Sequence, residues 1–172
     1  DLGGPTWFRL GDRDLALHVS RSQDLRRGVP LSEVTRDVCR AFGVRPVILP
    51  MTDDDVRTMV QTDRGEMAFQ EYFVHQACEP AVRGFRFFGA EAARPAPGVL
   101  EALGAADLVV ICPSNPWVSI DPILAIAGIR DGAARRTTVA VSPLVGGKAI
   151  KGPAAKMAAE LGIEPSPAAI AA

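Results

Sequence analysis

The sequence predicts an α/β fold, in which a parallel sheet is flanked by helices and a β-hairpin is inserted. Two apolar segments without polar alternation, at 107–112 and 137–142, are typical of strands buried on both faces of a parallel sheet. Each is followed by a polar loop and then by a helical pattern, which is the βαβα order of such folds. The length of 172 residues suits one domain, taken as residues 1–172.

The N-terminal part predicts two helices and a short strand. Residues 12–27 show helical periodicity, with Asp12 as the expected N-cap. A second helix is expected to open at Ser32 and to stop at Gly43. The apolar run PVIL at 46–49 stands between prolines and predicts a strand.

A β-hairpin is predicted next, from the arms 57–62 and 67–75 with a four-residue loop at 63–66. The second arm has no cleanly polar face, so we expect both of its faces to be covered. Residues 82–88 predict a further strand.

The second half predicts the parallel sheet and its helices. A short helix at 99–103 leads into the strand at 107–112, and another short helix follows the loop after that strand. Residues 128–136 are expected to be a connection to the strand at 137–142. A final helix is predicted from 154 to 162.

Composition and charge exclude several classes of protein. The formal net charge of −1 argues against a dedicated nucleic-acid-binding protein, which usually has a strongly basic face. No apolar stretch approaches the ~20 residues that span a bilayer. The three cysteines, Cys39, Cys78 and Cys112, are far apart and odd in number, which disfavours zinc sites and a disulfide framework. We expect a cytoplasmic protein.

The loop at 113–120 is the first candidate binding element. Ligands of open parallel sheets bind beyond the carboxyl ends of the strands, where this loop lies. Pro113 and Pro116 fix the backbone, so that Ser114 and Asn115 are held in a set direction. A helix opening near Ser119 would aim free N–H groups at the same place. The alternative is that proline and asparagine merely make a turn and that Ser119 merely caps a helix.

The loop at 143–153 is the second candidate. Gly146 and Gly147 allow close approach of the backbone to a ligand, while Lys148 and Lys151 bring positive charge. A helix begins after it, so the combination favours an anionic group such as phosphate. The alternative is a solvated lysine pair on a flexible loop.

Other polar and aromatic residues are weaker candidates. The carboxylates at 53–55 could bind a hard cation, but a polar turn with an aspartate cap is the simpler interpretation. His18 and His75 have no nucleophile in a motif beside them, so a hydrolase triad is unsupported. The segment FQEYFV at 69–74 could form the wall of a pocket for a flat ring, or simply belong to the core.

Several strings resemble one known family along essentially the whole chain. They are GGPTWFRLGDRDLALHVSR, PLSEVT, PMTDDDVRTMV, FQEYFV, ADLVVICPSNPWVSIDPIL with GIR, and VAVSPLVGGKAIKGPAAKMA. Their content and order are similar to those of the 2-phospho-L-lactate transferase family. PSNPxVSI and SPxVGGxAxKGPA are the specific motifs.

The resemblance implies a Rossmann-like fold and a role in coenzyme F-420 biosynthesis. Family members transfer a phospholactyl or phosphoenolpyruvyl group from a guanosine-diphosphate-activated donor to the deazaflavin Fo, release GMP and require Mg²⁺. On this basis Ser114, Asn115 and Ser119 would hold the guanosine or its phosphates. The phosphate side would fall to the second loop, at Gly146, Gly147, Lys148 and Lys151. The resemblance also implies a homodimer.

The chain departs from the family at its ends. The glycine-rich segment and the acidic motifs that begin the family, and a C-terminal part, have no counterpart here. We therefore expect a central fragment, with its metal ligands missing and no transferase activity alone. The alternative function is a non-catalytic, nucleotide-sugar-binding regulatory protein of the same superfamily. The Asn-Pro form of the first loop and the FQEYFV segment favour the transferase.

Overall fold

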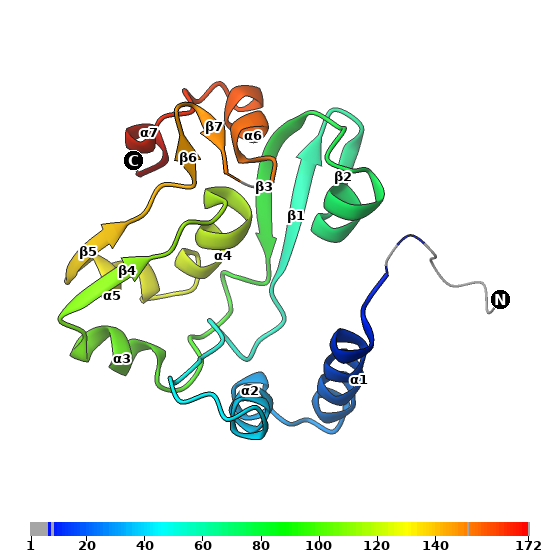
Figure 1. Cartoon of the computed structure of the whole chain (residues 1–172). Helices are drawn as coiled ribbons and strands as arrows, with labels where there is room; N and C mark the ends of the chain where they lie inside the picture. Colours follow the sequence, from blue (N-terminus) through cyan, green and yellow to red (C-terminus); the bar gives the residue numbers. More distant parts are fainter. Residues whose placement is uncertain (1–6, 8, 151, 172) are drawn as a thin grey trace.

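The computed structural model describes residue 7, residues 9–150 and residues 152–171. Two helices come first and lie at one end of the molecule, and an antiparallel sheet follows them (Figure 1). A parallel strand pair with its helices comes next, and a short hairpin and two helices end the chain. The predicted α/β class, with a parallel sheet, flanking helices and a β-hairpin, is confirmed.

The first two helices differ in how they attach to the rest. Helix α1 (Asp12–Arg26) has no buried residue, and its N-cap is Gly11, so the prediction of Asp12 as the cap was wrong by one residue. Helix α2 (Leu31–Ala41) buries Ser32 and Val34. Its first turn is held by Asp53, whose carboxylate accepts hydrogen bonds from the Ser32 N–H at 2.6 Å and from its hydroxyl at 2.8 Å.

The antiparallel sheet contains β1 (Arg57–Thr62), β2 (Gly65–Ala68) and β3 (Val82–Phe88) in the order β2-β1-β3. Thr62 pairs with Gly65, so the hairpin loop has two residues and not the four predicted. Gly65 has a φ of 105°, which favours glycine, and the Thr62 hydroxyl donates to its carbonyl at 2.7 Å. The second arm therefore begins at residue 65, two residues before its predicted start at 67.

The second arm does not continue to residue 75 as a strand. After Ala68 the chain turns into the π-helix η1 (Glu71–His75). The helical turn places the Tyr72 side chain fully inside the core, at 0% exposure. Phe69 and Phe73 stack with ring centroids 5.4 Å apart. Residues four apart in a strand would be about 13 Å from each other, so this contact requires the helical turn.

The main core joins the antiparallel sheet to a helix near the C-terminus. Val60, Tyr72, Val82 and Met157 are each fully buried and form one cluster. Met157 belongs to α6 (Ala154–Glu160), the predicted last helix. The Glu160 carboxylate of α6 accepts a hydrogen bond from the Val82 N–H at 2.9 Å, so the helix is tied to the sheet by polar as well as apolar contacts.

The parallel part of the fold is a two-stranded sheet with short helices around it. Strand β4 (Leu108–Ile111) pairs with β5 (Thr137–Ala140) in parallel, as predicted. The segment expected to be a plain connection, 128–136, contains a helix that buries Ile129 and Ala133. The remaining elements are α3 (Val99–Ala105), η2 (Pro116–Ile120), α4 (Asp121–Leu124), α5 (Ile129–Ala134), β6 (Leu144–Val145), β7 (Lys148–Ala149) and α7 (Pro167–Ala171).

Two predictions about strands were wrong. The apolar strands β4 and β5 were expected to be buried on both faces, yet Leu108, Val110 and Val139 are each about half exposed. The run at 46–49 was expected to be a strand, but it has no ladder partner, and Val47 is 84% exposed. Both differences have one physical reason: strand structure and burial require neighbours, and the described residues do not supply them here.

The described residues also bear on membrane association and on the cysteines. None of the helices in this part of the chain has the length and apolar character that crossing a bilayer requires. Cys39, Cys78 and Cys112 are all free thiols.

We expect Met157→Ala to lower the free energy of unfolding by about 2–5 kcal/mol, because the side chain is fully buried and its loss leaves a cavity. Val145→Ala is the control, since Val145 is 67% exposed and should change stability by less than about 0.5 kcal/mol. Urea unfolding followed by circular dichroism measures both. Equal effects of the two substitutions would show that α6 does not anchor the core.

Candidate functional site

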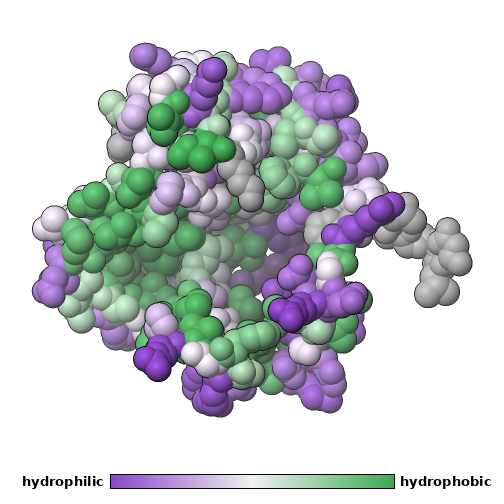
Figure 2. Space-filling model, in the orientation of Figure 1, coloured by the Kyte–Doolittle hydropathy of each residue, from purple (hydrophilic) through white to green (hydrophobic). Residues whose placement is uncertain are grey.

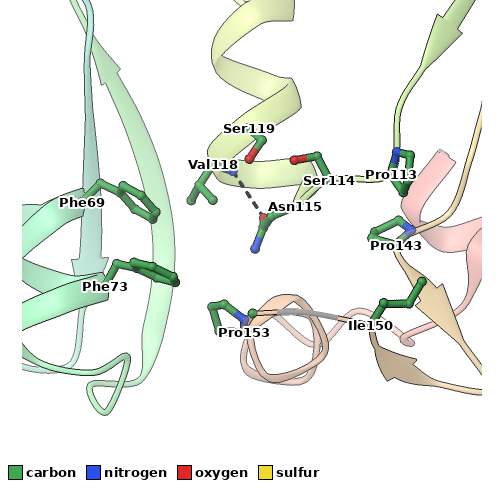
Figure 3. A pocket seen from close by; sticks show the side chains of 11 residues that line it. Phe69, Phe73, Pro113, Ser114, Asn115, Val118, Ser119, Pro143, Ile150 and Pro153 are labelled. Carbon is green, nitrogen blue, oxygen red and sulfur yellow. Dashed lines mark hydrogen bonds between the residues drawn. The ribbon is translucent and has the colours of Figure 1, made fainter. Parts of the chain in front are cut away.

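A cavity of about 330 Å³ lies where the antiparallel sheet faces the two candidate loops. This volume is at the lower end of the range of small-molecule sites. Figure 3 shows Phe69 and Phe73 on one side, Pro113, Pro143 and Ile150 on the other, and Asn115 between them. The lining residues are Phe69, Phe73, Pro113, Ser114, Asn115, Val118, Ser119, Pro143, Ile150, Gly152 and Pro153.

Asn115 holds the first loop in place. Its side-chain carbonyl accepts hydrogen bonds from the N–H groups of Trp117 at 3.1 Å and Val118 at 3.4 Å, which makes it the N-cap of η2. Its amide donates to the sulfur of Met157 at 3.2 Å. The cap is therefore Asn115, and not Ser119 as the alternative interpretation of this loop had it, and Asn115 also lines the cavity.

Ser114 and Ser119 are the hydroxyl groups of the cavity. Both line it, as the sequence predicted for the ligand-binding loop. Neither hydroxyl has a hydrogen-bond partner among the residues that the structure describes. They are therefore free to donate to, and accept from, a bound molecule.

The aromatic wall combines the two interpretations of the FQEYFV segment. Phe69 packs against the buried core cluster and also lines the cavity, and Phe73 is 42% exposed at the cavity. Behind them Phe85 of β3 stacks on Trp117 of η2, with ring centroids 6.4 Å apart and planes within 8°. The sheet and the first loop are thus held together by aromatic contact, and the exposed face of Phe73 is left for a ligand.

The second loop, at 143–153, lines the first cavity with fewer of its predicted residues than expected. Gly146 and Gly147 form the two-residue turn of the β6–β7 hairpin, with φ values of 57° and 73°. Such a turn needs positive φ at both positions, which explains the glycine pair without a ligand. Neither glycine lines the cavity; Lys148 is exposed, and Lys151 lies outside the described residues.

Three further residues of this loop complete the cavity. Ile150, Gly152 and Pro153 line it although the sequence analysis did not select them. Their apolar or backbone character carries no chemical signal. Only their position next to the predicted loop could have indicated them.

A second cavity, of about 530 Å³, lies at the carboxyl ends of β4 and β5. This is the edge at which open α/β sheets bind ligands. Ser114 and Pro143 line both cavities, so the two adjoin at these residues. Asp121 and Arg130 also line the second cavity, and sequence reasoning missed both because they lie outside the two loops.

Asp121 is the acidic group of the second cavity. Burial raises the pKa of its carboxyl above the ordinary value, and the positive charge of Arg130 opposes this shift. The closest approach of the two charged groups is 4.0 Å. Asp121 is therefore half-buried without a close ion pair, and its oxygens can accept hydrogen bonds from a ligand.

The carboxylates at 53–55 have structural partners and point to different places. Asp53 holds α2, as described above. Asp54 accepts from the Arg94 N–H at 2.8 Å, and Asp55 pairs with Arg57 at 2.5 Å. In the described part of the chain no three His, Cys, Asp or Glu residues gather to hold a metal ion. These residues do not fit a Mg²⁺ site as they lie here, and Asp53 has the capping role that the simpler interpretation expected.

The first cavity is lined by apolar side chains, hydroxyl groups and one amide. Within the described residues that line it, no side chain is acidic, basic or a thiol. The two histidines lie elsewhere: His75 stacks on Trp7 with centroids 5.1 Å apart, and His18 contacts Arg21. The lining residues can position a flat apolar ring and hydrogen-bond its polar substituents.

The chain thus combines an α/β fold with two adjoining cavities at the loops that follow its parallel strands. Residues 6–171 match the family described as 2-phospho-L-lactate transferase CofD, and the chain belongs to this family.

Named relatives fall into two groups. The chain is 47% identical over 173 residues to a phosphoenolpyruvate transferase of Thermobifida fusca. The matched region covers 97% of this chain and 53% of the relative. It is 43% identical over 166 residues to a 2-phospho-L-lactate transferase of Methanopyrus kandleri, covering 96% of this chain and 54% of the relative. The chain thus spans about half the length of the curated relatives that it matches.

A solved structure has a similar fold. A UPF0052-family protein from Bacillus halodurans superimposes with a TM-score of 0.55 at 18% identity, over 68% of this chain and 37% of that protein. At this identity the likeness concerns the fold alone.

We expect Asn115→Ala to destabilise the chain by about 1–2 kcal/mol, because two N–H groups of η2 lose their acceptor. Asn115→Asp keeps an acceptor at a helix N-terminus and should cost much less. Urea unfolding of the two variants separates these cases. If both lose the same stability, the capping contact is not what holds the loop.

Proposed function

We propose that these residues form part of the substrate site of a transferase of coenzyme F-420 biosynthesis. The reaction would move a phospholactyl or phosphoenolpyruvyl group from a guanosine-diphosphate-activated donor to the deazaflavin Fo, with release of GMP. The carrying observation is the pair of cavities that adjoin at Ser114 and Pro143, since a two-substrate transfer needs two neighbouring sites. The names of the relatives support the same reaction class.

The first cavity suits the acceptor. A tricyclic ring needs a flat apolar surface, and the exposed face of Phe73 supplies one beside the stacked Phe69. Polar groups on the acceptor chain would meet the unpartnered hydroxyls of Ser114 and Ser119. In this arrangement the acceptor's reacting hydroxyl lies toward the second cavity.

The second cavity suits the nucleotide of the donor. It lies at the carboxyl edge of the parallel strands, and the Asp121 carboxylate at its wall offers two acceptor oxygens. The Watson–Crick edge of guanine carries two neighbouring N–H donors, which match a carboxylate. Arg130 brings a positive charge to the same cavity for the diphosphate.

The described residues would act on this transfer by positioning. Holding both reactants in line converts an encounter in solution into a reaction within one complex. The proline-fixed loop supports this role, because Asn115 locks it to η2 and to Met157. We propose that the Mg²⁺ ligands come from outside the described residues, since the carboxylates at 53–55 are engaged elsewhere.

Phe73→Ala should weaken binding of Fo by about tenfold, because stacking on an aromatic ring contributes ~1–3 kcal/mol. Phe88→Ala is the matched control: Phe88 is also exposed, at 57%, but lies on β3 and does not line the cavity. Titration of the deazaflavin fluorescence with the 172-residue chain measures both. Equal weakening by the two variants, or no binding of Fo by a folded chain, would contradict the acceptor site.

Asp121→Asn should remove a preference for the guanine base. We expect the chain to bind guanosine diphosphate about tenfold more tightly than inosine diphosphate, which lacks the 2-amino donor, and the variant to bind both alike. Asp131→Asn, an acidic position of α5 outside the cavity, is the control. Calorimetric titration measures the affinities. Tighter binding of a uridine diphosphate sugar would instead favour the nucleotide-sugar-binding alternative.

A further inference from the structure

A left-handed turn follows η1, the element that carries Phe73 of the first cavity. Its two residues, Ala77 and Cys78, have φ values of 48° and 61°. Among the described residues they alone have a positive φ without being glycine. This region is disfavoured for residues that carry a Cβ, and such conformations persist only where the surrounding contacts hold them. The contacts that hold this turn therefore indicate what it positions.

Tyr72 and Cys78 clamp the turn through reciprocal hydrogen bonds. The Cys78 N–H donates to the Tyr72 carbonyl at 2.9 Å, and the Tyr72 hydroxyl donates to the Cys78 carbonyl at 3.4 Å. The Tyr72 side chain is fully buried in the main core with Val60 and Val82, so it ties the turn to the antiparallel sheet. Burial raises the pKa of Tyr72, which keeps its hydroxyl protonated as a donor.

The clamp also reaches the residue that faces the cavity. Phe73 follows Tyr72 directly, and its carbonyl accepts a hydrogen bond from the Cys78 thiol, with sulfur and oxygen 3.9 Å apart. Figure 3 shows the rings of Phe69 and Phe73 side by side and directed into the cavity. Neither Tyr72 nor Cys78 lines that cavity. Their contacts therefore fix the backbone of Phe73, while the ring of Phe73 stays available to a ligand.

We propose that Tyr72 and Cys78 are positioning residues of the first cavity, and that the left-handed turn at Ala77 and Cys78 fixes the ring of Phe73 in its wall. A ligand that needs this ring binds only the fraction of molecules in which the ring is in place, so a looser clamp weakens binding in proportion. The inference rests on the proposed function in so far as that ligand is the deazaflavin Fo. The position of the ring itself does not depend on the proposed function.

Ala77 allows the turn to be tested without changing a side chain of the cavity. Its side chain is exposed and lines neither cavity, so a substitution acts through the backbone. Ala77→Gly accepts the left-handed conformation and should keep the affinity for Fo within about twofold. Ala77→Val opposes this conformation, because a β-branched residue is an outlier at positive φ, and should weaken Fo binding by about tenfold or more. Ala102→Val, at an exposed position of α3, is the matched control and should leave the affinity unchanged.

Tyr72→Phe tests the clamp by a second route, because it removes the hydroxyl and keeps the buried ring. It should weaken Fo binding by about threefold or more, since one of the bonds that hold the turn is lost. Amide hydrogen exchange at 57–62, in the antiparallel sheet, reports whether each variant is folded. If Ala77→Val does not fold, Tyr72→Phe alone decides.

A measurement without ligand separates this inference from the proposed function. Nuclear Overhauser contacts between the labelled rings of Phe69 and Phe73 report the wall directly. We expect them to persist in Ala77→Gly and to weaken in Ala77→Val and Tyr72→Phe. Unchanged ring contacts in folded Ala77→Val and Tyr72→Phe, or an unchanged affinity for Fo where the contacts are lost, would overturn the inference. No binding of Fo by the unsubstituted chain would contradict the proposed function instead, and the ring contacts would still decide this inference.

Discussion

The burial of Met157 is the contact on which the rest of the structure depends. This side chain packs α6 against Val60, Tyr72 and Val82 in the main core. Its sulfur accepts a hydrogen bond from the side-chain amide of Asn115. One residue therefore links the antiparallel sheet, the C-terminal helix and the first candidate loop. The first cavity lies between these parts, so its shape follows from how closely they pack around α6.

In the first loop, some residues stabilise the fold and others line the cavity. Prolines fix the backbone, Asn115 caps η2, and Trp117 stacks on Phe85 of the sheet. These contacts use most of the polar and aromatic groups internally. What is left over is the pair of hydroxyls at Ser114 and Ser119, which face the cavity without partners in the described structure. Rigid support with a few free polar groups is the usual construction of a small-molecule site.

The parallel strands show how strongly burial depends on the surrounding chain. Their composition is that of interior strands, yet one face is open and one edge is unpaired. Apolar composition favours burial, but these strands stay partly exposed where none of the described residues packs against them, and Figure 2 shows apolar surface over this region. The open run at 46–49 has the same origin, since a strand exists only through its partner's hydrogen bonds.

The sequence by itself determined the α/β class, the parallel pair, strand β3 and helix α6, because periodicity, glycines and prolines act locally. It also located the first loop, through the prolines around Ser114 and Asn115. Only the tertiary structure decided that the chain after Ala68 becomes helical, since the gain comes from burying Tyr72 in a distant core. It likewise decided that Asp53 caps α2 and that Asp121 joins the second cavity. These outcomes depend on contacts between residues far apart in the chain, which no local pattern encodes.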